Sequence, residues 1–261
     1  MPGKGYALRS YRSLEDGDLR SFRVVVKETD LLIRVDAKSY REDLPAAVEK
    51  AVYRGRVQLE TYMADNPDFK GTLEPWLAAP QDPPLVRRLA RAANPAGVGP
   101  MAAVAGVFAE LAGDYLKTRC REVLVENGGD IYIFSSKKRR IAVLAGESPL
   151  SNRLALEVPP RPQPWGVCTS SRSGPSLSLG RADAAVILAE SPALADAVAT
   201  AAANRVQVKE DVQGAVVFAA AVRGVFGVLV IKGDTMGAKG QVNLVELPQT
   251  GQSPALPGGT G

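Results

Sequence analysis

The sequence contains no histidine and only two cysteines, Cys120 and Cys168, among its 261 residues. The lack of histidine excludes a Ser-His-Asp triad, a Cys-His dyad and any zinc, haem or non-haem iron site with a histidine ligand. Two thiols are too few for an iron–sulfur cluster or a four-cysteine zinc site. This count gives no sign of an oxidising compartment, and we expect no disulfide because no predicted element brings the two cysteines together.

A strong charge of one sign and a long apolar run are also lacking. Lysine and arginine number 32 and aspartate and glutamate 28, an excess too small to indicate a nucleic-acid partner. Residues 1–12 lack the apolar segment of a secretory signal. The apolar stretch 214–231 is interrupted by Arg223, so we predict a buried helix followed by a strand. We therefore expect a cytoplasmic protein with no membrane partner.

The remaining groups that could carry chemistry are carboxylates, hydroxyls, lysine, arginine, tyrosine, the two thiols and backbone amides. If a metal is bound, hard oxygen ligands favour Mg²⁺ or Ca²⁺. The apolar residues make up 46 % of the chain, which is enough to bury a sizeable core without disulfides or a structural metal.

The periodicity divides residues 1–247 into two similar halves of one domain, about 6–118 and 119–247. In each half strands come first and helices follow, which predicts an α+β fold with mainly antiparallel sheets and helices packed on one face. The Pro- and Gly-rich tail, 248–261, is predicted to be disordered. The expected strands are 19–27, 31–37, 122–126, 131–135, 140–145, 154–158, 166–170, 182–189, 225–231 and 242–247. The expected helices are 40–64, 85–93, 101–117, 192–205 and 212–222, with a loop at 65–84.

One of these helices carries an isolated polar line. Asp196, Thr200 and Asn204 recur every four residues, so they share one face of a helix that is otherwise mostly Ala, Leu and Val. A helix this apolar is expected to be buried, so the line needs a polar partner, a cation or a ligand. A carboxylate and a hydroxyl one turn apart suit Mg²⁺. The alternative is a face turned to water; we expect the line Asp196–Thr200–Asn204 to face an internal cleft instead.

A Ser- and Gly-rich segment follows the strand predicted at 166–170. Its hydroxyls, its amides and Arg172 suit phosphate oxygens, although an ordinary polar loop accounts better for the pattern alone. The alternation places Cys168 on the strand, where we expect a buried, unreactive thiol.

Two glycine-containing segments and a basic run complete the candidates. The turn at 126–130 would let a ligand approach the backbone, but a simple hairpin explains it as well. The small residues at 97–106 would leave free amides for an anion, with close helix packing as the alternative. The basic run 137–140 is expected to be a solvated turn.

Five segments, in this order, resemble the shorter branch of the ApbE-like superfamily, which is found in archaea and anaerobic bacteria and is related to the FAD:protein FMN transferases. The resemblance extends from about Thr29 to Leu247. The segments are ETDLLI at 28–33, VGPMAAVAG at 98–106, VENGGDI at 125–131, GVCTSS at 166–171 and ALADAVAT at 193–200.

The resemblance implies a fold, cofactors and site residues. The transferases bind FAD with Mg²⁺, attach FMN through a phosphoester to a threonine of a target protein, and have a duplicated fold related to the tunnelling fold (T-fold). By resemblance, Asp196 and Thr200 bind the metal together with a backbone carbonyl at or next to Val104, and Asp130 ends the Gly-Gly-Asp turn. The candidate cofactor-binding residues are Gly99, Gly128, Gly129, Thr169, Ser170 and Ser171.

The departures from the transferases bear on activity. Their His-containing insertion is replaced by the short stretch 173–178, and Ala105 stands where they have a lysine. Metal and nucleotide binding survive this comparison better than FMN transfer. Any general base would then be a carboxylate such as Asp130 or Asp183.

Two functions stay open from the sequence. The first is a Mg²⁺-dependent enzyme that acts on FAD or another nucleotide with a pyrophosphate. The second is a non-enzymatic assembly or partner-binding module in a redox or sulfur-assimilation (homocysteine) pathway of anaerobes. The identity of any protein partner and the oligomeric state, a homodimer included, also stay open.

Overall fold

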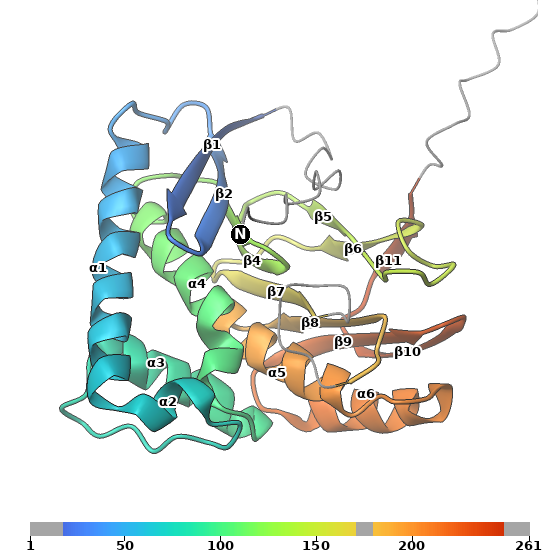
Figure 1. Ribbon diagram of the computed structural model, residues 1–261. Helices are drawn as coiled ribbons and strands as arrows, with labels where there is room; N and C mark the ends of the chain where they lie inside the picture. Colours follow the sequence, from blue (N-terminus) through green and yellow to red (C-terminus); the bar gives the residue numbers. More distant parts are fainter. Residues whose placement is uncertain (1–17, 171–179, 248–261) are drawn as a thin grey trace, which may run out of the picture.

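The computed structural model describes residues 18–170 and 180–247. Its centre is an eight-stranded sheet of order β1-β2-β3-β4-β7-β8-β9-β10, in which every neighbouring pair is antiparallel (Figure 1). The pairing of β2 with β3 joins the two predicted halves in this one sheet. The strands are β1 Leu19–Val26, β2 Thr29–Asp36, β3 Val123–Asn127, β4 Asp130–Phe134, β7 Trp165–Ser170, β8 Ala184–Ala189, β9 Val225–Lys232 and β10 Thr235–Gly240.

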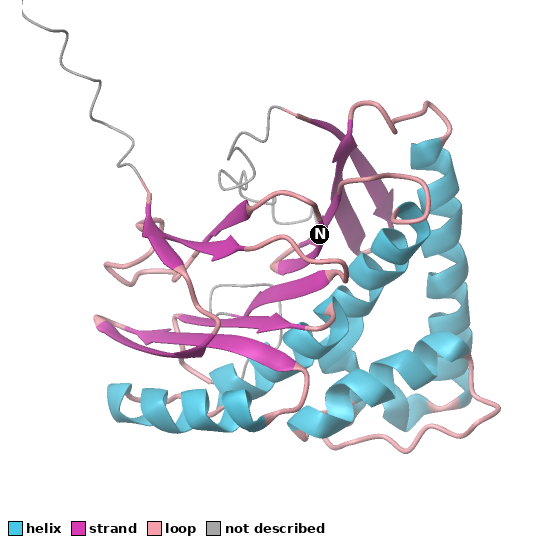
Figure 2. Ribbon diagram, turned by 180° about the vertical axis from the view of Figure 1, so that it is seen from behind, coloured by secondary structure: helices cyan, strands magenta, loops and turns pink. Residues whose placement is uncertain are grey.

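Helices cover one face of this sheet (Figures 1 and 2). The most central helix is α5, which packs on β7, β8 and α4 and in which every residue except Asn204 is buried. The helices are α1 Leu44–Asp65, α2 Pro67–Gly71, α3 Pro84–Ala93, α4 Val104–Leu116, α5 Pro192–Asn204 and α6 Val212–Ala221, with short 3₁₀ turns η2 Asn94–Ala96, η3 Pro100–Ala103 and η4 Lys209–Asp211.

A small second sheet covers part of the opposite face (Figure 1). Its order is β11-β6-β5, and its strands are β5 Arg139–Ala142, β6 Leu154–Val158 and β11 Leu244–Glu246. Leu156 and Val158 of β6 pack with Trp165, Leu188 and Ile231 of the large sheet in a second apolar core. The predicted α+β class, with mainly antiparallel sheets, is therefore confirmed, and β7 and β8 lie between two cores.

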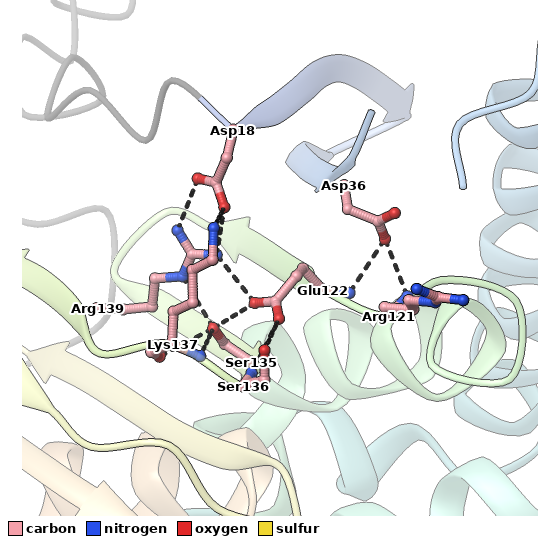
Figure 3. Close-up of polar contacts among 8 residues, drawn as sticks. All are labelled: Asp18, Asp36, Arg121, Glu122, Ser135, Ser136, Lys137 and Arg139. Atoms are coloured by element: carbon pink, nitrogen blue, oxygen red, sulfur yellow. Dashed lines mark hydrogen bonds and ion pairs between the residues drawn. The ribbon is translucent and has the colours of Figure 1, made fainter. Parts of the chain in front are cut away.

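A buried polar network ties the edge of the second sheet to the first (Figure 3). The Arg139 side chain, 2 % exposed, pairs with Glu122 at 2.9 Å and with Asp18 at 3.2 Å. Glu122 also accepts a hydrogen bond from the backbone N–H of Ser136 at 3.0 Å. The prediction of a solvated turn for 137–140 is therefore wrong for Arg139, because that side chain turns inward to a buried carboxylate.

Several boundaries differ from the prediction. The first helix begins at Leu44 rather than at residue 40, because Pro45 suits the first turn of a helix. The predicted loop 65–84 contains α2, and β10 was not predicted, since two of its six residues are glycines. The tail 248–261 lies outside the described residues.

No single helix in the described part of the chain is long and apolar enough to cross a membrane. The helical segments 84–96 and 100–116 reach that length and composition only when taken together, and they are bent by 100° relative to each other.

Candidate functional site: two carboxylates and a thiol

Asp196 is held in the interior by the way α5 begins. Ser191 caps the helix by accepting the N–H of Leu194, and Pro192 fills the first turn, where a missing N–H costs nothing. One turn later the Asp196 side chain is 7 % exposed, and its Oδ2 accepts the backbone N–H of Gly106 at 2.9 Å. Asp196 and Thr200 of the predicted polar line are therefore turned inward, Asn204 at the end of the helix is half-buried, and an internal cleft along this line stays a prediction.

The beginning of α4 supplies the amides for this carboxylate. Gly106 is required there, because a Cβ at this position would lie 2.3 Å from the Pro192 carbonyl oxygen of α5. The two helices can therefore approach until the amides of Ala105 and Gly106 reach Asp196. The positive end of a helix dipole favours a carboxylate in this position. The small residues at the start of α4 thus allow close helix packing and also leave amides free to bind an anion. That anion is the Asp196 carboxylate of the protein itself.

Asp130 and Cys168 meet the same carboxylate from the sheet. They lie directly opposite each other in the β4–β7 pair, so their side chains share one face. One side-chain donor atom each of Asp130, Cys168 and Asp196 lies within 4.8 Å of the others, and all three residues are buried. We call these three residues the acid–thiol cluster.

The turn before Asp130 fixes this approach. Gly128 has φ +74°, which an L side chain rarely adopts. At Gly129 a Cβ would lie 2.6 Å from the carbonyl oxygen of Thr169, and the Gly129 carbonyl accepts the Thr169 N–H at 3.0 Å. The double glycine therefore lets the β3–β4 turn lie against β7 and sets Asp130 opposite Cys168.

No basic side chain compensates the charge in the cluster among the residues that the structure describes. Burial raises the pKa of Asp130 to about 7, and the lowering influences on it are hydrogen bonds with Cys168 and Asp196. Burial and then the Asp130 charge raise the pKa of Asp196, against the two α4 amides. Burial raises the pKa of the Cys168 thiol, and both carboxylates add to this. The metal-free cluster therefore holds protons that ordinary surface carboxyls would have lost.

Two buried oxygen atoms of this region have no hydrogen-bond partner within the described ranges: Asp130 Oδ1 and Ser170 Oγ. Ser170 is two residues beyond Cys168 on β7, so it lies on the same face of the strand. A buried polar atom without a partner is costly unless something absent from the chain satisfies it. The donor set, two carboxylates with nearby hydroxyl and thiol groups, fits a divalent cation.

The structure brings some further candidates close to the cluster in the fold. Thr200 is buried one turn after Asp196, and Val104 is the first residue of α4, two residues before Gly106. The neighbouring carbonyl, that of Ala105, accepts a hydrogen bond from Asn127 at 2.9 Å. Metal binding by Thr200 and by the Val104 carbonyl stays a prediction.

Other candidates are placed differently. Asp183 accepts the N–H of Gly233 at 2.6 Å and pairs with Lys232 at 3.4 Å. It lies four residues along the chain from Ile187, the partner of Cys168, which is about 13 Å in a strand. Asp183 is therefore not part of the acid–thiol cluster.

Backbone packing accounts for two more. A Cβ at Gly99 would lie 1.9 Å from the carbonyl oxygen of Thr72, so close packing explains this glycine. The Thr169 amide is engaged with Gly129 and is not free for a phosphate. Ser171 lies outside the described residues.

The sequence reasoning missed the role that position gives to Cys168. The predicted buried thiol on a strand is confirmed, and its raised pKa agrees with low reactivity, but its position close to two carboxylates was not predicted. Predicting this position would have required knowing that the strand after the Gly-Gly turn pairs with the strand that carries Cys168. Periodicity does not give the order of strands in a sheet.

Comparison with known proteins gives the family. The model of a family described as "AbpE bacteria" matches residues 11–222. A UPF0280 protein of Methanosarcina acetivorans is 40 % identical over 220 residues, which cover 83 % of this chain and 85 % of the relative. The protein UPF0280 MK0206 of Methanopyrus kandleri is 39 % identical over 230 residues, covering 85 % and 90 %. The chain belongs to this family, within the ApbE-like superfamily.

Solved structures share the fold. The flavin transferase ApbE from Vibrio cholerae superposes with a TM-score of 0.56 at 14 % identity, covering 85 % of this chain and 97 % of that chain. The ApbE protein of Thermotoga maritima gives a TM-score of 0.52, also at 14 % identity, covering 84 % and 96 %. The α+β architecture is therefore ApbE-like.

Proposed function

We propose that the protein binds a divalent cation between Asp130 and Asp196 and, through this cation, the pyrophosphate of FAD or a related nucleotide. The observation that supports this most is Asp130 Oδ1, a buried carboxylate oxygen to which no described residue donates a hydrogen bond. Asp130 lies close to a second buried carboxylate, and no basic side chain of the described residues lowers its pKa. The ApbE-like fold and family point the same way, and Mg²⁺ and FAD come from the resemblance to the transferases.

The chain's own residues would divide the work. The α4 amides hold and orient Asp196, and the β4–β7 pairing holds Asp130. Thr200 and the carbonyl at or next to Val104 are the further ligands that the resemblance suggests, and Ser170, two residues beyond Cys168 on the same face of β7, offers a further hydroxyl. A cation bound there would neutralise pyrophosphate charge and polarise its phosphorus–oxygen bonds.

We place nucleotide binding ahead of FMN transfer. Transfer requires the attacking hydroxyl to lose its proton, and a positioned base contributes about 10²- to 10⁴-fold. Of the two carboxylates expected as bases, Asp183 is engaged with Lys232 and Gly233. Asp130 would be a metal ligand, and a ligand that holds a cation is a poor base.

Flavin titration tests the binding proposal. Purified protein is titrated with FAD, with and without Mg²⁺, while flavin absorbance and fluorescence are recorded. We expect Mg²⁺-dependent binding that weakens at least about tenfold in Asp130→Asn and Asp196→Asn, since loss of even a supporting contact costs a metal site that much. Asp183→Asn is the matched control, because it removes an acid of the same sheet from outside the cluster.

A second assay tests transfer. The protein is incubated with FAD, Mg²⁺ and a flavinylatable target domain, and a covalently fluorescent target band is sought. Robust transfer that is lost in Asp196→Ala would contradict our placing binding first. Failure to bind FAD, FMN or ATP would favour the assembly-module alternative.

A further inference from the structure

We infer that Cys168 Sγ is itself a metal ligand, so that the site selects a borderline divalent transition metal such as Zn²⁺, Co²⁺ or Fe²⁺ over Mg²⁺. This inference rests on the proposed metal binding and specifies which cation the site takes. The residue types carry it: a thiolate is a soft ligand, and Mg²⁺ is bound by oxygen alone.

Position is the first argument. Cys168 Sγ and one carboxylate oxygen each of Asp130 and Asp196 lie within 4.8 Å of one another. Two ligand atoms at about 2.0–2.3 Å from one ion are at most about 4.6 Å apart. The cluster therefore needs only small shifts to close around a single cation, and a cation that both carboxylates bind would meet the sulfur as well.

The unpartnered oxygen of Asp130 is the second and independent argument. Asp130 lies directly across from Cys168, is 6 % exposed, and its Oδ1 has no donor among the described residues. A thiol placed only for packing would be surrounded by apolar groups, as buried cysteines usually are. Here the carboxylates of Asp130 and Asp196 converge with it from β4 and α5.

The proton balance is simple. When Sγ coordinates the cation, the S–H bond breaks and the proton leaves to the solvent, because the thiolate is the ligand form. Any protons that Asp130 and Asp196 hold are released in the same way. No electron is transferred, and no other reactant is needed.

Cobalt supplies a direct test on the unmodified chain. Protein freed of metal with a chelator is titrated with Co²⁺ alone, and the near-ultraviolet absorption is recorded for the charge-transfer band of a cobalt–thiolate bond. We expect this band in the wild type and in Cys120→Ser, since Cys120, the other buried cysteine, is not in the cluster. We expect Cys168→Ser to lose the band.

Affinities complete the test. In competition titrations, Cys168→Ser should lose about 10- to 100-fold in Zn²⁺ affinity, on the order of losses at supporting residues of metal sites, while Mg²⁺ affinity changes little. Cys168→Ala serves if the serine variant does not fold, as judged by circular dichroism. Cobalt bound without the band, or an unchanged Zn²⁺ affinity in the variants, would overturn the thiolate ligand but leave the proposed function standing. If the wild type binds none of Mg²⁺, Mn²⁺, Co²⁺ and Zn²⁺, both are overturned.

Discussion

Replacing Asp130 with asparagine should stabilise the metal-free protein at neutral pH and above. The reason is the pKa of this carboxyl, which burial raises from 3.8 to about 7. Between these two values the folded state holds a proton that the unfolded state has released. The free energy of unfolding therefore falls as the pH rises from about 4 to about 7, and the loss is complete above pH 7.

The size of the effect follows from the same shift. One pKa unit corresponds to about 1.4 kcal/mol, so the full cost of ionising Asp130 in the folded protein is about 4 kcal/mol. Asparagine keeps the shape of the side chain and removes the charge. We expect Asp130→Asn to gain roughly 1–4 kcal/mol at pH 8 and almost nothing at pH 4, where the native carboxyl is already protonated.

Urea denaturation of chelator-treated protein at pH 4, 6 and 8 measures this. Adding metal should narrow the difference, because the wild type gains about 2.7 kcal/mol at a metal concentration 100 times its Kd, whereas a variant that binds tenfold more weakly gains about 1.4 kcal/mol. Asp183→Asn is the control and should show neither the gain at pH 8 nor the narrowing, since it breaks a contact with Lys232 outside the cluster. A metal-free Asp130→Asn protein that is less stable than the wild type at pH 8 would refute the reasoning.

Four further substitutions test the glycines that position the site and the buried Arg139 network, each by urea denaturation and metal titration. Gly129→Ala should lower the free energy of unfolding by about 1–3 kcal/mol and weaken metal binding, because the new methyl lies 2.6 Å from a β7 carbonyl oxygen. Gly128 has φ +74° and open space around it, so Gly128→Ala should lower the free energy of unfolding by about 1–2 kcal/mol through the backbone alone. Gly106→Ala should also cost about 1–3 kcal/mol and loosen the α4 amide contact; equal metal binding in Gly106→Ala and wild type would contradict the role given to that contact. Arg139→Met should cost about 3–5 kcal/mol by leaving Glu122 buried without its partner, with metal affinity unchanged; a loss below about 1 kcal/mol would contradict this.

The sequence predicts most elements of this fold because its signals are local. Alternation in β1 and β2 and the capped, Ala-rich start of α5 depend on neighbours only. The Gly-rich strand β10 escapes prediction, because glycine has no side chain to show a period and the strand is formed by pairing with β9. The second sheet is not predicted for a different reason. Its strands β5, β6 and β11 are predicted as strands, but no local signal indicates which sheet they join.

The same division holds for the site. Asp196 can be found from the sequence, since a lone carboxylate in an apolar helix needs a partner. Its partners cannot, because Gly106 is 90 residues away along the chain and reaches it only through the close approach of α4 and α5. The inward turn of Arg139 is likewise decided by Glu122, which directly precedes β3 and lies 17 residues before Arg139 in the chain. A run of like charges therefore predicts exposed side chains only where the fold places no buried opposite charge beside them.

The two buried carboxylates of the cluster are not equivalent, and the difference indicates which is completed from outside the chain. Asp196 receives backbone amides at the start of a helix, so the fold itself provides for its charge. Asp130 stands opposite a thiol, and its Oδ1 has no donor within the described part of the chain. A fold selected only for stability would gain by replacing such a group with an apolar one. Under the proposed function, a cation that binds the folded state would complete Asp130, and the cost of burying this carboxyl without metal would be the other side of the affinity.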